Sequence, residues 1–168
     1  MTPLPPTDSD LASGMPASNR FRILIVDDLP QNRQILSQIL MRVGYDVEAV
    51  SNGDDALLRV ACQPRPDLIV TDVEMPGMDG IAIVTALRQM PEVVARIPVI
   101  AASGSLDPIL KRDMMLAGAD AFLAKPVDIP LLLETAGRLI RQGPQRKAES
   151  PVETTAASVN RLPSKVHG

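Results

Sequence analysis

Four short apolar runs are the feature of this sequence that most restricts the fold it can adopt. Each run is nearly continuous in branched or small apolar residues, as expected of parallel strands that are covered on both faces. A fifth segment, residues 46–50, alternates polar and apolar residues, which is typical of a half-exposed strand at the edge of a sheet. The four apolar runs are residues 23–26, 68–71, 99–102 and 121–124.

A helical pattern follows each of the five predicted strands. Gly44 comes directly after the first pattern, in the position where glycine commonly ends a helix. Asp107 and Asp128 stand before the last two patterns as capping residues, each with a proline in the first turn. The predicted helical stretches are residues 35–43, 56–61, 81–88, 108–118 and 130–140.

Five strands that each precede a helix predict an α/β domain. The expected architecture is a (βα)5 doubly wound, parallel five-stranded sheet with helices on both faces. Sheets of this size commonly have the strand order 2-1-3-4-5, and the alternating second strand suits an edge position in that order. Functional residues are then expected in the loops at the carboxyl ends of the strands, near the switch between the first and third strands.

Composition divides the chain of 168 residues into a middle and two ends. The middle, residues 21–142, contains all the Ile, Leu and Val clusters and is long enough to bury a core. The ends, residues 1–20 and 143–168, are rich in Pro, Ser, Thr and Ala, which predicts disordered tails on either side of one domain.

Charge and rare residue types exclude several functional classes. The formal net charge is −3, there is no basic stripe, and the chain has no Trp, so direct nucleic-acid binding is not expected. One Cys and one His cannot form a zinc site, a disulfide framework or a Cys/His catalytic pair. Because no run approaches the ~20 apolar residues of a membrane span and no signal peptide is recognisable, a soluble, cytoplasmic protein is expected.

The residues that follow the predicted strands are polar and chemically useful. Asp27 and Asp28 follow the first strand, Asp72 the third, Ser103 the fourth and Lys125 the fifth. Since the first and third strands should be neighbours, three carboxylates would converge, and their repulsion calls for a cation or a raised pKa. An all-oxygen ligand set favours a hard divalent ion, and Mg²⁺ is the natural choice.

Such a site suits phosphoryl transfer. A carboxylate can act as the nucleophile and form an aspartyl phosphate, while a metal ion and a lysine offset the charge on the transferred oxygens. Asp72 is the best candidate nucleophile because it ends the most central strand. Lys125 supplies a mobile cation, and Ser103 offers a hydroxyl to a phosphate oxygen.

Taken together, these residues resemble the signature of the response-regulator receiver domains of two-component signalling. The signature elements are Asp27–Asp28, Asp72 within TDVEMPGMDG, Ser103 within IPVIAASG, and Lys125–Pro126 within AFLAKPVD. Each element alone is weak, but in this order and each at a strand end they are highly specific. The resemblance covers roughly residues 22–141 and implies the flavodoxin-like receiver fold.

The resemblance implies how the acidic residues would act. Asp72 would be the phosphoacceptor, on a protein that assists its own phosphorylation and dephosphorylation rather than being an enzyme with a separate substrate. Mg²⁺, with Mn²⁺ as a possible substitute, would be ligated by Asp72, directly by Asp28 and largely through water by Asp27. The main-chain carbonyl of Glu74 would complete the protein ligands.

The resemblance also implies roles for the residues around the phosphoryl group. Lys125 would pair with Asp72 and then with the phosphate, and the Lys125–Pro126 bond is expected to be cis. Ser103 and Phe122 would form the switch pair, with Phe122 in the place of the tyrosine often found there. Glu74 and Ser105 flank the expected path of the attacking water and are candidates for tuning hydrolysis.

The partners implied are proteins rather than nucleic acids or membranes. A sensor histidine kinase or a histidine phosphotransfer protein would dock near the first helix. A downstream protein target would bind the face formed by the fourth helix, the fifth strand and the fifth helix, and the receiver would be a monomer or a phosphorylation-linked dimer. The expected contacts for the phosphoryl donor are Pro30, Asn32, Arg33 and Leu36.

Three alternatives stay open at this point. An aspartyl-phosphate phosphatase or phosphotransferase of the haloacid-dehalogenase kind would need a second Asp two residues after its nucleophile, where Asp27 has Leu29 and Asp72 has Glu74. A scaffold receiver would signal without being phosphorylated, although the full acidic set argues against it. A receiver derived from a hybrid kinase is the third alternative, and the ends of the chain favour a separate, stand-alone protein instead.

Overall fold

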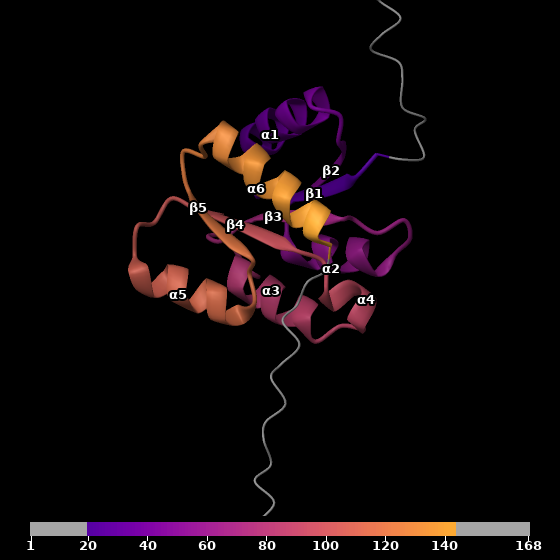
Figure 1. Ribbon diagram of the computed structural model, residues 1–168. Helices are drawn as coiled ribbons and strands as arrows, with labels where there is room; N and C mark the ends of the chain where they lie inside the picture. Colours follow the sequence, from indigo (N-terminus) through magenta and orange to yellow (C-terminus); the bar gives the residue numbers. More distant parts are fainter. Residues whose placement is uncertain (1–19, 144–168) are drawn as a thin grey trace, which may run out of the picture.

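The computed structural model describes residues 20–143, in which five strands alternate with helices (Figure 1). The predicted tails, apart from Arg20 and Gly143, lie outside the described residues. The strands are β1 (Arg22–Val26), β2 (Asp46–Val50), β3 (Leu68–Asp72), β4 (Val99–Ser103) and β5 (Ala121–Ala124). The helices are α1 (Pro30–Arg42), α2 (Gly53–Ala61), α3 (Gly80–Arg88), α4 (Glu92–Ala95), α5 (Pro108–Ala117) and α6 (Ile129–Gln142).

The strands form one parallel sheet in the order β2-β1-β3-β4-β5, which confirms the predicted fold class and strand order. Every residue of β3 and β4 is buried, while β2 at one edge is mostly half-buried, as its alternating sequence indicates. The sheet therefore has a dry centre, and β1 and β3 lie side by side within it.

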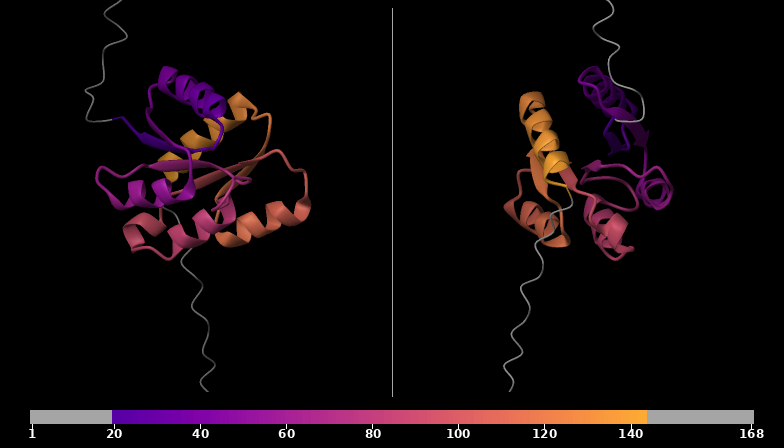
Figure 2. Two further views of the ribbon diagram at one scale, coloured as in Figure 1. Left: turned by 180° about the vertical axis from the view of Figure 1, so that it is seen from behind. Right: turned by 45° about the vertical axis from the view of Figure 1, so that its right-hand side comes forward.

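Helices cover both faces of the sheet (Figure 2), and the side chains between the helices and each face form a separate core. Alternate residues of each strand point to opposite faces, so Ile25 packs toward one core and Leu24 toward the other. Leu40 of α1 and Leu132 of α6 belong to the first core, whereas Met114 of α5 belongs to the second, together with apolar residues of α2, α3 and α4. Within the described residues, no helix is long and apolar enough to cross a membrane.

Capping residues begin and end the helices largely where the sequence indicates. The side chains of Asp79, Asp107 and Asp128 accept hydrogen bonds from backbone N–H groups in the first turns of α3, α5 and α6. Gly44 and Gly118 have φ angles of +100° and +115°, which a residue with a Cβ rarely adopts, at the ends of α1 and α5.

Several details differ from the sequence-based predictions. β5 was expected to be covered on both faces, but it is an edge strand in which only Leu123 is buried. α1 begins at Pro30, before the apolar stripe that starts at residue 35. The four-residue helix α4 was not predicted, because a single turn is too short to show a helical period; the fourth and fifth predicted helices are therefore α5 and α6. Asp72 and Ser103 are the last residues of β3 and β4 rather than the first residues after them, since both still take part in the pairing of neighbouring strands.

Candidate functional site

The acidic residues converge at the carboxyl ends of the two central strands. Asp27 follows β1 directly, and Asp72 ends its neighbour β3. Asp27 and Asp72 are only 3% and 6% exposed, while Asp28 is half-buried. Carboxylate oxygens of all three lie within 4.8 Å of one another. The parallel sheet thus brings together three negative groups that are up to 45 residues apart in the chain.

Asp27 is held in place by the first turns of α1. Its carboxylate accepts hydrogen bonds from the Leu29 amide at 2.9 Å and from Asn32 Nδ2 at 3.1 Å. Arg33 donates to the main-chain oxygen of Asp27 at 2.7 Å. Asn32 and Arg33, which sequence reasoning considered only as partner contacts, therefore also position the acidic site. Their spacing of one to two helical turns from Asp27 is the signal that could have indicated this.

Lys125 bridges two of the three acids. Its Nζ lies 3.1 Å from Asp72 Oδ1 and 3.2 Å from Asp27 Oδ2. Burial by itself would lower the pKa of Lys125, but the hydrogen bond to Asp72 and the charges of Asp27 and Asp72 outweigh it and raise that pKa. The lysine is therefore fully protonated at neutral pH. The Lys125–Pro126 peptide bond is cis.

Asp72 keeps an unfavourable environment despite the lysine. Burial raises the pKa of the Asp72 carboxyl above its ordinary value, and the negative charge of Asp27 acts in the same direction. The hydrogen bond and the charge of Lys125, together with the Glu74 amide that donates to Asp72 Oδ1 at 3.2 Å, offset only part of this effect. The anionic form of Asp72 therefore gains from any further positive charge placed beside it.

These residues fit a divalent cation bound by oxygen ligands. One lysine cannot neutralise three carboxylates, and within the described residues the Asp28 side chain forms no hydrogen bond or ion pair. Mg²⁺ is commonly held by one or two carboxylates together with several waters, and Asp28 and Asp72 offer such a pair. A cluster of this kind is typical of the magnesium site of receiver domains.

Ser103 and Glu74 face each other across the ends of β4 and β3. Glu74 Oε2 accepts hydrogen bonds from Ser103 Oγ at 3.0 Å and from the Gly104 amide at 3.1 Å. Ser103 Oγ in turn accepts from the Ser105 amide at 3.0 Å. Glu74, Ser103 and Ser105 were predicted from the sequence, but the Gly104 amide was not, because a backbone donor leaves no mark in the sequence.

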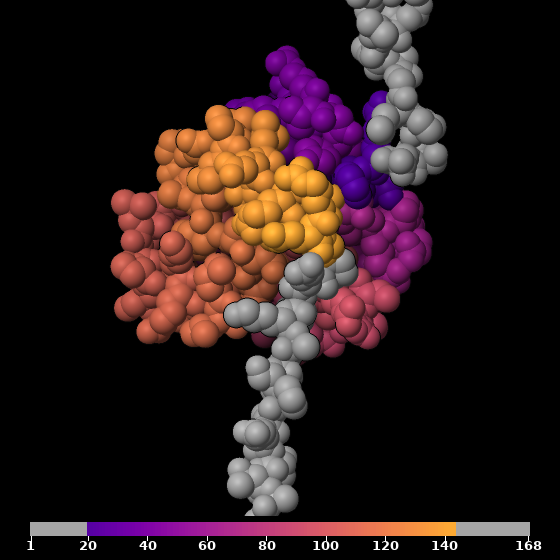
Figure 3. All heavy atoms as spheres, viewed as in Figure 1, coloured from indigo at the N-terminus to yellow at the C-terminus, as the bar shows by residue number. Residues whose placement is uncertain are grey.

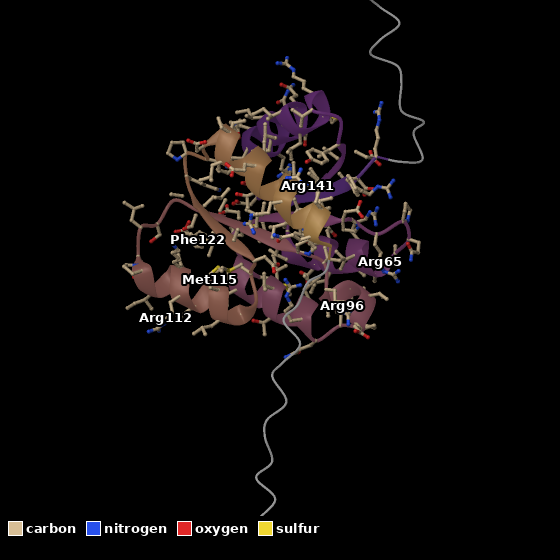
Figure 4. The ribbon with its side chains drawn as sticks, viewed as in Figure 1. Arg65, Arg96, Arg112, Met115, Phe122 and Arg141 are labelled. Carbon is tan, nitrogen blue, oxygen red and sulfur yellow. The ribbon has the colours of Figure 1, made fainter. Side chains whose placement is uncertain are left out.

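Phe122 lies at the outer side of this arrangement, on β5. It pairs with Ala101 of β4 in the sheet and packs, half-buried, against the core that contains Met114. In Figure 4, Phe122 and Met115 lie on neighbouring β5 and α5. The ring thus lies between the strand that carries Ser103 and a helix of the molecular surface.

Known proteins with similar sequences are response regulators and sensor kinases. The family model described as "Response regulator receiver domain" matches residues 23–136. The gliding motility regulatory protein of Myxococcus xanthus is 39% identical over 125 residues, which are 74% of this chain and 16% of that protein. The sensor histidine kinase GacS of Pseudomonas protegens is 35% identical over 142 residues, 80% of this chain and 15% of the kinase. The chain therefore spans only a small part of the length of these relatives.

Solved structures agree with this assignment. The chemotaxis protein CheY4 of Vibrio cholerae has a TM-score of 0.66 and 32% identity, covering 71% of this chain and 98% of that one. A response regulator receiver protein from Pseudomonas putida has a TM-score of 0.67 and 32% identity, covering 71% and 97%. The predicted sheet, the acidic site and these matches agree, and the chain belongs to the response regulator receiver domain family.

Proposed function

We propose that Asp72 accepts a phosphoryl group from a histidine kinase or a histidine phosphotransfer protein, as a step in phosphorelay signalling. The observation that carries this proposal is the placement of Asp72 Oδ1 3.1 Å from Lys125 Nζ, next to the carboxylates of Asp27 and Asp28. Receiver domains are typically phosphoacceptors rather than enzymes, and histidine kinases phosphorylate them. Burial raises the pKa of Asp72, and shifted pKa values of this kind are common among residues of functional sites.

The transfer itself requires little beyond position and charge. A carboxylate oxygen of Asp72 attacks the phosphorus, and the phosphorus–nitrogen bond to the donor imidazole breaks as the new oxygen–phosphorus bond forms. Lys125 stays close enough to follow the negative charge onto the phosphoryl oxygens. Mg²⁺, when bound by Asp28 and Asp72 with Asp27 and the Glu74 carbonyl nearby, would neutralise further charge on those oxygens.

A groove beside the acidic site suits the phosphoryl donor. It has a volume of about 370 Å³ and lies between α1 and the segment that joins β5 to α6. Asn32 and Leu36, two of the four expected contacts, line it, and Ile35, which is 55% exposed, adds an apolar rim. Because Asp27 and Lys125 also line this groove, a helix of the donor lying in it would have its histidine near Asp72.

The output surface is proposed to be the face formed by α5, β5 and α6. Figure 3 shows α6 on the visible side of the molecule, between α1 and α5. Ile109 and Leu116 on α5 and Leu131 on α6 are large apolar side chains that water reaches, which suits a protein partner. Movement of Ser103 toward a phosphoryl group, with a change in the burial of Phe122, would connect Asp72 to this face.

Phosphorylation with acetyl phosphate tests the proposal. The protein is incubated with acetyl phosphate and Mg²⁺, and a mass increase of one phosphoryl group is expected for the wild type but not for Asp72→Asn or in the presence of EDTA. Asp79→Asn is the matched control, because asparagine also caps a helix and Asp79 lies outside the acidic cluster. Labelling of Asp72→Asn would contradict the assignment of the nucleophile. No labelling of the wild type would favour the scaffold receiver instead.

A further inference from the structure

The carboxylate of Glu74 makes two hydrogen bonds through one oxygen at the edge of the acidic site. Its Oε2 accepts from the Ser103 hydroxyl at 3.0 Å and from the Gly104 amide at 3.1 Å. Ser103 is fully buried, whereas Glu74 is an exposed residue of the loop between β3 and α3. The exposed carboxylate of Glu74 thus accepts hydrogen bonds from two donors at the end of β4, and one of them, the Ser103 hydroxyl, is on a buried residue.

These donors lie next to the proposed phosphoacceptor. Asp72 pairs with Ala102 across the sheet, so Ser103 is the next and last residue of the neighbouring strand β4, and Gly104 follows it directly. Two donors that converge on one anionic oxygen form a small anion site, and a phosphoryl oxygen on Asp72 has the charge and the acceptor capacity to fill it. Glu74 and a phosphoryl group would then compete for the same hydroxyl and the same amide.

We propose that the Glu74 side chain is a built-in competitor of the phosphoryl group. In the unphosphorylated protein it holds Ser103 Oγ and the Gly104 amide away from Asp72, and phosphorylation exchanges one anionic acceptor for another. This inference rests on the proposed function, which it deepens by naming a positioning residue. The hydrogen bonds from Ser103 and Gly104 to Glu74 must break before these donors can bind the phosphoryl group. Glu74 therefore stabilises the unphosphorylated state.

The test measures the affinity of the Mg²⁺-loaded full chain for beryllofluoride, a mimic of the phosphoryl group. Charge-assisted hydrogen bonds are stronger than neutral ones, so Glu74→Gln should bind beryllofluoride about tenfold more tightly than the wild type, and Glu74→Ala at least as tightly as Glu74→Gln. Glu92→Gln is the matched control. It removes the same charge from α4, which precedes β4 and so lies toward the opposite end of the sheet, and its affinity should equal that of the wild type.

A double-mutant cycle separates competition from simple repulsion between Glu74 and the bound anion. In a Ser103→Ala background, Glu74→Gln should improve beryllofluoride binding by about twofold at most, because the shared hydroxyl is absent and Glu74 competes only for the Gly104 amide. An equal gain in both backgrounds, or no gain in either, would overturn the proposal. A wild type that binds no beryllofluoride would overturn the proposed function as well.

A spectroscopic readout does not depend on phosphorylation. In the unphosphorylated chain, Glu74→Gln should shift the amide proton resonance of Gly104 upfield, since its hydrogen bond to a carboxylate oxygen is lost. The resonance of Gly118, at the end of α5, serves as the internal control. An unchanged Gly104 resonance would show that Glu74 does not hold this amide, whatever the outcome of the beryllofluoride titrations.

Discussion

The charged residues of the acidic site, Asp27, Asp72 and Lys125, interact where water has little access to the carboxylates. Lys125 contacts two carboxylates at 3.1 and 3.2 Å, and it gains a raised pKa from them. Burial and the negative charge of Asp27 together raise the pKa of Asp72 by more than Lys125 and the Glu74 amide lower it, so the pKa of Asp72 is raised as well. A carboxylate whose anion is poorly stabilised in the resting protein would suit the proposed phosphoryl transfer, which brings positive charge to it.

Asp72→Asn should therefore stabilise the folded protein at pH 7 without Mg²⁺, by on the order of 1 kcal/mol. The folded-state pKa of Asp72 lies above the ordinary value of 3.8, so the folded protein holds its proton more tightly than the unfolded chain does. The contribution of Asp72 to the stability of the wild type then falls as pH rises from about 3.8 through the raised pKa. The advantage of the variant should disappear well below that ordinary value.

Urea unfolding at several pH values measures this effect. Mg²⁺ should remove the advantage of Asp72→Asn by stabilising the wild type selectively, because the ion binds the folded acidic cluster. Asp113→Asn, on the exposed surface of α5, provides the control and should change stability by less than about 0.5 kcal/mol. Destabilisation by Asp72→Asn at pH 7 would contradict the raised pKa.

At the scale of elements, the connection from β3 to α3 fixes the position of Asp72. Asp79 caps α3, and the amide of Gly80 donates to the main-chain oxygen of Val73 at 2.8 Å. The absence of a side chain at Gly80 allows this approach. A Cβ there would lie 2.6 Å from the Asp72 carbonyl oxygen and 2.8 Å from Val73 Cα, both of them backbone atoms that cannot turn aside.

Gly80→Ala should consequently damage both stability and the site. We expect a loss of about 2 kcal/mol in the free energy of unfolding and weaker Mg²⁺ binding, since the backbone on both sides of Asp72 must move. Gly137→Ala on α6 is the control, because its nearest neighbour is the flexible end of Arg141 at 3.1 Å. Alanine in that helix interior should stabilise by up to about 1 kcal/mol. Unchanged Mg²⁺ affinity in Gly80→Ala would show that this close packing does not position Asp72.

At the scale of the whole molecule, the sheet separates two cores, and the acidic site lies at the edge of the sheet formed by the carboxyl ends of the central strands. α5 and α6 pack on opposite faces of the sheet, on either side of its edge strand β5, which includes Phe122. Lys125 N donates to Ser103 O at 2.8 Å, which connects the end of β4 to the segment after β5. A shift of the backbone at Asp72 can therefore be passed to β4, which pairs with β3, and from β4 to the segment after β5.

Hydrogen exchange of the full chain tests this coupling. Mg²⁺ with beryllofluoride should change the amide exchange rates in α5 and β5 by about threefold or more. The exchange rates in α2, which contacts β1 and β2 away from β5, should stay within about twofold. Asp72→Asn treated in the same way provides the control and should show no change in α5. A response confined to the loops around Asp72 would mean that the α5–β5–α6 face does not receive the signal.

Much of the fold was predictable because local patterns and topology rules agree. Buried parallel strands need continuous apolar runs, which identified β1, β3 and β4, and a similar run identified the half-exposed edge strand β5. Asp107 and Asp128 stand where helix caps are needed. The single turn of α4 was missed because four residues carry no period. Asp27, Asp28, Asp72 and Lys125 were found as neighbours because the carboxyl ends of adjacent parallel strands meet at one edge.

The sequence by itself thus determined the order of strands and helices and the set of charged groups at the strand ends, because both follow from short-range pattern and chain topology. The tertiary structure alone decided which donor meets which acceptor. It placed Asn32 on Asp27, directed Ser103 and the Gly104 amide to Glu74, and brought Gly80 against the backbone of Asp72. Distances of about 3 Å between residues far apart in the chain depend on how helices pack on the sheet, and no local pattern encodes that packing.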